Sequence, residues 1–383
     1  MGKGNPEHLK IGIVFDDSLD KPDGVQQYVL SIGGWLTRQG HEVHYLVGQT
    51  KRSDVPLVHS LSRNIAVTFN GNQLSIPLPV SRNKLSQLLQ REQFDILHVQ
   101  MPYSPWLAHR LILAAPRRTV IFGTFHIVGI SRLVQLATRG LALWTNRSLR
   151  RFSTVVSVSS AAADYAKATY KLTTAVLPNV LDYPRFHTAQ PILPATASGL
   201  RILFLGRLVE RKGCRYLLEA VRLLMAQSST SFEVVICGKG PLLSELQAYA
   251  NKYALPVRFT GFVSEADKPG YYASANIAVF PSTGGESFGI VLLEAMASGQ
   301  TAVLAARNSG YASVMRKRPD LLFNPKDAPD LAQHIASLLH DDSRRKATAS
   351  WGAAYSQTFD SAVVGAQLVS LYRKAIIAES ALD

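Results

Sequence analysis

The chain has 383 residues, of which 47% are apolar and 18% charged, and a formal net charge of +14 at pH 7. This length exceeds what one hydrophobic core usually organises, so two domains of similar size in a globular protein are expected. Two cysteines exclude a disulfide framework, and no run of about eighteen apolar residues is present to form a membrane-spanning helix. The first residues lack the apolar segment of an export signal, so a cytoplasmic location is expected.

The first part of the chain alternates short β-rich runs with helical patterns. Buried parallel strands are predicted at 9–15, 41–47, 94–99, 119–125, 153–159 and 174–178. Helices between them are predicted at 25–38, 84–91 and 161–170. Residues 1–181 are therefore expected to form one doubly wound, Rossmann-like α/β domain.

The pattern lapses after Asn179 and then restarts. Residues 182–199 are rich in Pro, Ala, Ser and Thr and are predicted to be an interdomain linker. Further strands are predicted at 200–206, 232–238, 257–262, 277–282 and 301–306, and helices at 327–340, 343–356 and 361–378. Residues 200–360 should thus form a second doubly wound domain, and residues 361–383 a helix that crosses back to the first.

Ligands of doubly wound sheets bind beyond the carboxyl ends of the strands, so the loops there are the first candidates for chemistry. The loop "GRLVERKG" places the cations Arg207 and Lys212 after a strand, where they could clamp a diphosphate. An ordinary basic helix start is the alternative. In "CGKGP", Gly238 and Gly240 would let the backbone approach a ligand closely.

The stretch "GGESFGIVLLEAMASG" (284–299) combines a glycine turn, a helix start and two acids. The helix is predicted to begin near Phe288 and Gly289, where free N–H groups could hold a phosphate. Glu286 lies just before that helix and Glu294 about two turns along it. Because a carboxylate can accept hydrogen bonds from two hydroxyls, we expect one acid to bind a sugar and the other a ribose. Two ordinary surface acids are the alternative.

These loops resemble those of the retaining nucleotide-sugar glycosyltransferases of family 4, which have the GT-B fold. The resemblance rests on E-x7-E after a strand, the Gly-Arg…Lys-Gly loop and the Gly-x-Gly-Pro turn. Segments similar to the family's N-terminal half follow in its order at 22–43, 94–102, 123–126, 157–165 and 177–186. Among family members the phosphatidylinositol mannosyltransferases are the most similar, through "GVQ", "FNG" and "TFH". The resemblance implies two Rossmann-like domains that face a deep interdomain cleft.

The resemblance also implies roles for individual residues. Arg207 and Lys212 would neutralise the leaving diphosphate, Glu286 would hold the donor sugar, and His126 would reach the transferred sugar. A histidine that caps a strand end in the core is the alternative for His126. The implied donor-binding residues are Gly24, Gly206, Gly238, Gly240, Val263, Glu265, Ser287, Phe288, Gly289 and Glu294. Gln26 and Asn70 would face the acceptor.

The expected activity is therefore transfer of a hexose with retention, with no tightly bound cofactor and no requirement for a divalent metal. Glu265 would match the family's base-reading acid and so favours GDP-mannose as donor, because a carboxylate pairs with the two adjacent N–H donors of guanine. A solvated acid at a helix start is the alternative for Glu265. A lipid-linked acceptor such as phosphatidylinositol is expected, although Ser and Pro follow "FNG" where these mannosyltransferases carry a basic residue. A UDP-sugar with a soluble or polysaccharide acceptor, and a non-catalytic sugar-nucleotide-binding protein, are the alternatives.

The basic charge is concentrated in one interval, because no acid occurs between Asp95 and Asp164. Residues 127–152 alternate apolar and basic residues, as an amphipathic helix on an anionic bilayer would. The membrane-facing residues would be Arg132, Arg139, Arg147, Arg150 and Arg151. Peripheral association with the inner face of the plasma membrane is therefore expected, although such a helix could also pack into its own domain. Nucleic acid is not an expected partner, since no aromatics alternate with the cations. The oligomeric state is left open.

Overall fold

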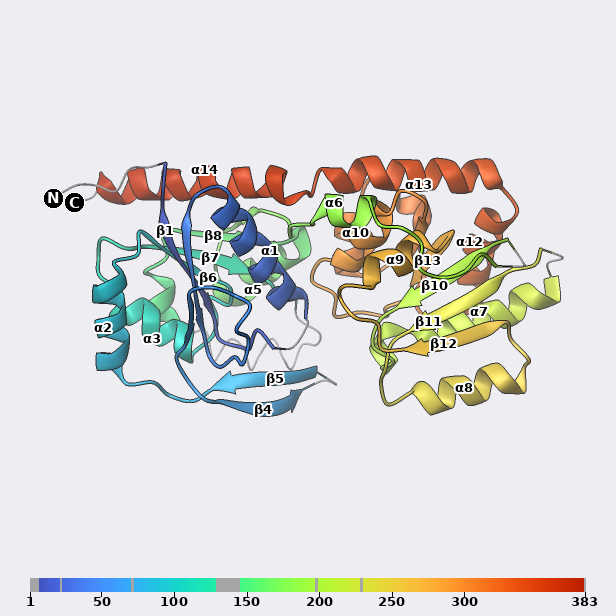
Figure 1. Ribbon diagram of the computed structural model, residues 1–383, viewed down its shortest axis with the longest axis horizontal. Helices are drawn as coiled ribbons and strands as arrows, with labels where there is room; N and C mark the ends of the chain where they lie inside the picture. The colour runs from blue at the N-terminus through green and yellow to red at the C-terminus, as the bar shows by residue number, and fades with distance from the viewer. Residues whose placement is uncertain are drawn as a thin grey trace. The chain divides into compact units, whose positions relative to one another are not determined.

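The computed structural model describes residues 7–20, 23–69, 72–128, 145–196, 199–227 and 230–381. The chain divides into two compact units, shown in Figure 1. The first contains Met1–Val180 together with Ser361–Asp383, and the second contains Leu181–Asp360.

The first unit is built on a parallel sheet with strand order β3-β2-β1-β6-β7-β8-β9. The strands are β1 (Lys10–Phe15), β2 (Glu42–Val47), β3 (Val58–Ser60), β6 (Ile96–Val99), β7 (Val120–Phe125), β8 (Thr154–Ser157) and β9 (Ala175–Val176). The described helices are α1 (Gly24–Arg38), α2 (Arg82–Glu92), α3 (Leu107–Ala114), α5 (Ser160–Tyr170) and α14 (Ser361–Ser380). The strand order reverses between β1 and β6, which is the position where doubly wound sheets bind ligands.

An antiparallel hairpin of β4 (Asn64–Phe69) and β5 (Asn72–Pro77) also belongs to the first unit. Neither this hairpin nor the short strand β3 is predicted by the sequence pattern. Both lack the continuous apolar run by which the buried parallel strands were recognised.

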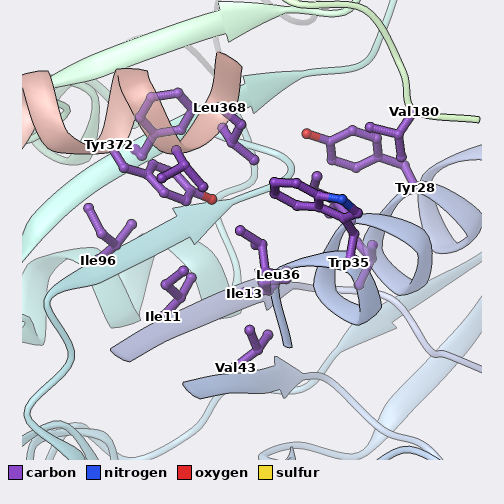
Figure 2. Packing of buried hydrophobic residues seen from close by; sticks show 14 of the residues in the cluster. Ile11, Ile13, Tyr28, Trp35, Leu36, Val43, Ile96, Val180, Leu368 and Tyr372 are labelled. Atoms are coloured by element: carbon purple, nitrogen blue, oxygen red, sulfur yellow. The ribbon is translucent and has the colours of Figure 1, made fainter. Parts of the chain in front are cut away.

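The core of the first unit requires the last helix of the chain. Figure 2 shows Leu368 and Tyr372 of α14 among the side chains of β1, α1 and β6. Gly365 lets α14 lie close to α1, because a Cβ at this position would come within 2.4 Å of Cε3 of Trp35. The Tyr372 hydroxyl forms a 2.6 Å hydrogen bond with Nδ1 of the buried His98. Helix α14 is therefore an integral part of the first unit.

The second unit has a parallel sheet with strand order β12-β11-β10-β13-β14-β15. Its strands are β10 (Arg201–Leu205), β11 (Glu233–Cys237), β12 (Val257–Gly261), β13 (Ile277–Phe280), β14 (Ala302–Ala306) and β15 (Leu322–Phe323). Its helices are α6 (Tyr183–His187), α7 (Cys214–Gln227), α8 (Leu243–Lys252), α9 (Lys268–Ala273), α10 (Ile290–Ala297), α11 (Ser309–Val314), α12 (Ala328–Leu339) and α13 (Asp342–Gln357). Here the order reverses between β10 and β13. The prediction of two doubly wound α/β sheets is confirmed.

Residues 182–199 were predicted as a linker; the described part, 182–196, begins with a short helix and then packs on the second unit. Asp182 caps α6 by accepting a hydrogen bond from the backbone of Arg185. The amides of Ile192 and Leu193 both donate to Oγ of Ser274, at 3.0 Å each. A five-residue helix is too short to produce a periodic pattern, so the composition suggested only a linker.

The first and last residues of the second unit lie side by side. Leu181 and Asp360 form a parallel β-bridge, and the Leu181 amide donates to the Phe359 carbonyl at 2.8 Å. The second unit therefore begins and ends at one place.

Candidate functional site

The loops after β10 and β13 meet at the strand-order reversal of the second unit. The loop after β10 contains a 3-10 turn at Glu210–Lys212, and the loop after β13 leads through Gly284 to α10. The amide of Thr283 and the hydroxyl of Ser282 both donate to the Arg211 carbonyl, at 2.8 and 3.0 Å. These hydrogen bonds join the two loops at the position where this sheet type binds ligands.

The Glu286 carboxylate is the centre of this loop pair. Its Oε1 accepts hydrogen bonds from Arg211 Nη1 at 2.8 Å, Lys212 Nζ at 2.8 Å and Ser282 Oγ at 2.7 Å. Burial alone would raise the pKa of the Glu286 carboxyl, but the charges of Lys212 and Arg211 hold it below its ordinary value. Two cations against one carboxylate leave surplus positive charge at the cluster, which suits an anionic ligand.

The sequence pattern predicted Arg207 from this loop, and it did not predict Arg211 or Ser282. Arg207 is exposed directly after β10. Arg211 precedes Lys212 in the 3-10 turn, which directs both side chains to Glu286. Its position next to Lys212 was the available signal. The loop contains two arginines, however, and the sequence alone gave no reason to prefer Arg211 to Arg207. Ser282 gave none, because its role depends on the pairing of the two loops.

Glu294 lies about one turn into α10 and is buried, with 4% of its surface exposed. The reading of Glu294 as an exposed helix residue is therefore wrong, and so is its placement two turns along. Oε1 receives Lys268 Nζ at 3.3 Å, whereas the buried Oε2 has no hydrogen-bond partner among the described residues. Burial raises the pKa of the Glu294 carboxyl, and Lys268 opposes that rise.

Lys268, also missed, is shared between two acids. Its Nζ lies 2.8 Å from Oε2 of Glu265 and 3.3 Å from Oε1 of Glu294. Burial alone would lower the pKa of Lys268, but the charges of Glu294 and Glu265 raise it. The Glu265 side chain is 38% exposed, and its backbone carbonyl accepts a hydrogen bond from Arg185. The buried Lys268 thus contacts both Glu265, the predicted acid for the base, and Glu294, the predicted acid for the ribose.

The glycines of "CGKGP" bring two loops of the protein together. A Cβ at Gly238 would lie 1.9 Å from the Gly206 carbonyl oxygen, and one at Gly240 would lie 2.2 Å from that of Leu208. The Gly206 amide donates to the Cys237 carbonyl at 2.9 Å. These glycines are thus required by the packing of the loops after β10 and β11, whether or not a ligand binds there.

The remaining donor-site candidates lie in the neighbouring loops. Gly289 is the N-cap of α10 with a φ of +120°, a backbone conformation that favours glycine. The Phe288 ring is buried and lies edge-on to Phe359, so this residue can offer a ligand only its backbone. Ser287 lies beside it, and the half-buried Val263 follows β12.

In the first unit, His126 is buried at the end of β7. Its Nε2 is hydrogen-bonded to Oε1 of Gln100 at 3.0 Å, and its ring lies edge-on to Tyr28 with centroids 5.1 Å apart. Burial lowers the pKa of His126 to about 3, so the ring is neutral at physiological pH. These contacts fit the alternative of a histidine that caps a strand end, and they also leave a neutral ring beside the strand-end loops.

Gly24 and Gln26, two candidates on the first turn of α1, differ in their surroundings. A Cβ at Gly24 would meet no described atom within 4 Å, so the protein itself does not require glycine there. Gln26 is buried, and its side-chain amide donates to the Leu19 carbonyl at 2.9 Å. This hydrogen bond uses one of the two N–H groups of the amide, so the predicted contact with an acceptor does not require it to break.

Three candidates lie outside the described residues: Asn70, Arg132 and Arg139. Of the other arginines predicted to face a membrane, Arg147 and Arg150 are exposed. Arg151 donates to the carbonyls of Ala115 and Pro116 at 3.3 Å each, which is a structural role. Among the described residues, no helix is both long enough and apolar enough to cross a bilayer.

One group in the described part of the chain has side chains spaced for a metal: His44, His59 and Glu92, whose ligand atoms lie within 4.8 Å of one another. Hydrogen bonds account for this cluster. His44 Nδ1 lies 2.8 Å from His59 Nε2, and Lys10 Nζ lies 3.0 Å from Glu92 Oε2. A lysine ammonium therefore already neutralises the carboxylate that a metal would need.

Comparisons with known proteins cover both units. Residues 22–185 match the family model described as Glycosyltransferase Family 4, and residues 190–353 match that described as Glycosyl transferases group 1. The chain is 30% identical over 372 residues to the phosphatidyl-myo-inositol mannosyltransferase of Mycobacterium tuberculosis, covering 95% of this chain and 96% of the relative. It is 31% identical over 369 residues to that of Mycolicibacterium smegmatis, covering 95% and 93%.

Among solved structures, the chain is similar to Anabaena Alr3699/HepE in complex with UDP. The TM-score is 0.70 at 19% sequence identity, with 95% of this chain and 99% of that chain covered. At this identity the likeness shows the fold alone, which is the GT-B arrangement of two Rossmann-like domains.

Proposed function

The chain belongs to glycosyltransferase family 4 and has the GT-B fold, and on that basis we propose that it transfers mannose from GDP-mannose, with retention, to a lipid-linked acceptor. The observation that carries this proposal is the cluster at the β10/β13 strand-order reversal. Arg211, Lys212 and Ser282 meet on one oxygen of Glu286. The remaining N–H groups of Arg211 and Lys212 can bind a diphosphate, while the second oxygen of Glu286 can accept a sugar hydroxyl.

The proposed chemistry is electrostatic. As the bond from the sugar to the diphosphate breaks, negative charge grows on the leaving group, and Arg207, Arg211 and Lys212 would stabilise it. Glu286 would hold the donor sugar, and the backbone amides at the start of α10 would add hydrogen bonds to phosphate. His126 would contact the transferred sugar as a neutral ring. In this proposal no divalent metal is required for donor binding.

GDP-mannose is the preferred donor for two reasons. The relatives at about 30% identity over nearly the whole chain are named as mannosyltransferases. Glu265, 38% exposed in the loop after β12, presents an acid that suits the adjacent N–H donors of guanine. A UDP-sugar is the second candidate, because the solved structure of similar fold is a complex with UDP.

Phosphatidylinositol or a related membrane lipid is the proposed acceptor. The names of the relatives support it, and so does the acid-free, arginine-rich interval between Asp95 and Asp164. An anionic bilayer attracts such an interval by roughly 1 kcal/mol for each cation near its surface. The enzyme would then act at the inner face of the plasma membrane.

A donor and acceptor screen tests this proposal. Purified protein is incubated with radiolabelled GDP-mannose, UDP-glucose or UDP-N-acetylglucosamine, with vesicles that contain or lack phosphatidylinositol. We expect a lipid-extractable product only with GDP-mannose and phosphatidylinositol. Transfer from a UDP-sugar alone would overturn the donor assignment. Donor binding without transfer to any acceptor would favour a sugar-nucleotide-binding protein.

Replacing Glu286 tests the cluster itself. Glu286→Gln keeps the size of the side chain but removes the charge that Arg211 and Lys212 share, so we expect the rate of transfer to fall roughly a hundredfold or more. Glu210→Gln is the matched control, since Glu210 is exposed in the same 3-10 turn. Initial rates under saturating donor, with circular dichroism to check folding, measure both. Equal rates for Glu286→Gln and wild type would refute the assigned site.

A further inference from the structure

The Glu294 carboxylate in the second unit has one oxygen occupied and one open. Oε1 lies on Lys268, whereas Oε2 is buried and has no hydrogen-bond partner among the described residues. Most buried polar atoms in folded proteins are hydrogen-bonded, and leaving a charged one unpaired is costly. An orphaned oxygen of this kind indicates that the fold holds it for a partner that binds later.

Lys268 is suited to bind Oε1 of Glu294 and to leave Oε2 open for a ligand. Lysine carries a compact charge at a single nitrogen, whereas arginine presents a fork that would take both carboxylate oxygens. Lys268 is itself buried, as the first residue of α9, and it is anchored on its other side by Glu265 at 2.8 Å. Helices α9, α10 and α6 pack on one another, which fixes the lysine and the carboxylate relative to each other (Figure 1).

The other titratable groups around Glu294 do not replace Lys268. Tyr272 of α9 is buried and cannot carry a positive charge. Its hydroxyl also has no hydrogen-bond partner among the described residues. The charge of Arg185 on α6 lowers the pKa of Glu294 less than the charge of Lys268 does. The charge of Glu265 raises that pKa. His187 of α6 lies at the end of α10, on the Ala297 carbonyl. Lys268 is therefore the main positive charge that opposes the rise in the pKa of this carboxyl.

We propose that Lys268 is a positioning residue for the donor: it holds Glu294 so that Oε2 accepts the adjacent hydroxyls of the donor's ribose. This inference rests on the proposed function, in which a nucleotide sugar binds the second unit. It predicts that the site distinguishes a ribonucleotide from its deoxy analogue and that this discrimination depends on Lys268. The adjacent hydroxyls can donate hydrogen bonds to such an acceptor oxygen, and they are the groups that the 2′,3′-dideoxy analogue lacks.

Isothermal titration tests the proposal by comparing dissociation constants for GDP, or UDP if the protein prefers it, and the 2′,3′-dideoxy analogue. In wild type we expect the ribonucleotide to bind roughly ten- to a hundredfold more tightly, as for hydrogen bonds to a charged group. Lys268→Met should reduce this ratio to within about threefold of one at pH 6.5, with the affinity for the dideoxy analogue unchanged. Glu210→Gln, which removes an exposed acid of the same unit with no assigned ligand contact, is the control and should retain the wild-type ratio.

The pH dependence separates positioning from general damage. Without Lys268 the pKa of the Glu294 carboxyl rises further, so the ribose preference of Lys268→Met should recover as the pH is raised and the carboxyl ionises. If Lys268→Met does not fold, Lys268→Gln carries the same test, because its amide can donate to Glu294 but has no charge.

The outcomes distinguish the inference from its premise. If the wild type and Lys268→Met prefer the ribonucleotide over the dideoxy analogue by the same ratio at every pH, the role of Lys268 is refuted, whereas the role of Glu294 is not. Equal losses of affinity for both nucleotides in Lys268→Met also refute it, because they indicate structural damage. A wild type that binds GDP or UDP without discrimination refutes the role of Glu294. A wild type that binds neither nucleotide refutes the proposed function as well.

Discussion

Glu286 and Glu294 occupy two different electrostatic environments although both follow the same strand. Two cations meet on Glu286, which leaves a positive surplus. Glu294 shares a single lysine with Glu265, which leaves no surplus. The first environment therefore suits an anion and the second suits neutral hydroxyl donors. This difference is the physical basis for placing the diphosphate at the cations around Glu286 and the ribose at Glu294.

Gly24 allows a test of donor proximity that does not disturb folding. A methyl group there would meet no described atom, and alanine is the better helix former, so Gly24→Ala should leave stability unchanged or raise it by up to about 1 kcal/mol. If the donor passes over this residue, transfer should fall roughly a hundredfold, because displacement of about 1 Å has that cost. Initial rates and urea unfolding measure the two effects.

Two other glycines in the same helix act as controls for Gly24→Ala. A Cβ at Gly34 would meet only the flexible Arg38 at 3.6 Å, so Gly34→Ala should leave activity intact and, as at Gly24, leave stability unchanged or raise it by up to about 1 kcal/mol. At Gly33 it would lie 2.3 Å from the Tyr45 hydroxyl, and Gly33→Ala should destabilise the unit by about 1–3 kcal/mol. Full activity in Gly24→Ala would show that no ligand approaches this residue.

His126 should make stability depend on pH. Its folded pKa is about 3, below the ordinary value of 6.5, so the unfolded chain binds the proton first and stability is lost as the pH falls below 6.5. Between pH 7 and pH 5 this amounts to about 2 kcal/mol. His126→Gln should remove that part of the pH dependence, while its amide can still donate to Gln100. Urea unfolding at both pH values checks it, and a variant as pH-dependent as wild type would contradict the assignment.

The candidate-site residues that the sequence predicts are those whose chemistry is visible in the chain itself. Glu286 and Lys212 stand beside glycine turns at strand ends, so their types and positions pointed to a ligand. Lys268 could not be recognised, because its importance depends on Glu294, which lies on another helix. The burial of His126 agrees with the core histidine that was the alternative for this residue. The burial of Gln26 could not be foreseen, since it depends on a contact with the Leu19 carbonyl.

At the scale of elements, the parallel strands were the most predictable feature. β1, β7 and β10 all agree with their predicted ranges to within about a residue, because strands buried on both faces are continuously apolar. The hairpin β4–β5 and the five-residue α6 were missed. Both are held by local hydrogen bonds rather than by a long apolar face, so neither left a periodic signal.

Helix α14 should tolerate substitutions on one face and not on the other. Gly365→Ala would bring a methyl group within 2.4 Å of the rigid Trp35 ring, so we expect a loss of about 1–3 kcal/mol in the free energy of unfolding. Val363→Ala on the exposed face should change it by less than about 0.5 kcal/mol. Urea unfolding followed by tryptophan fluorescence compares the two. Equal stabilities would mean that α14 does not pack on α1 in this register.

At the scale of the whole molecule, the net charge of +14 favours anionic surfaces in general. If one face of the protein binds the membrane specifically, the arginines on that face contribute more to vesicle binding than arginines elsewhere. Arg147→Gln with Arg150→Gln should weaken binding to anionic vesicles roughly thirtyfold, at about 1 kcal/mol for each lost cation. Arg258→Gln with Arg344→Gln removes the same charge from exposed positions of the second unit and should have little effect. Sedimentation with anionic and neutral vesicles measures both, and equal losses would indicate a non-specific attraction.

The side-by-side pairing of Leu181 with Asp360 has a consequence for how the protein is made. The second unit is one continuous stretch of chain and can fold as soon as it has left the ribosome. The first unit emerges earlier, but the contacts of Trp35 and His98 with α14 cannot form at that stage. Helix α14 is synthesised only after the entire second unit. The half of the protein that is translated first is thus the half that matures last. Until then its exposed apolar surface is a natural substrate for a chaperone.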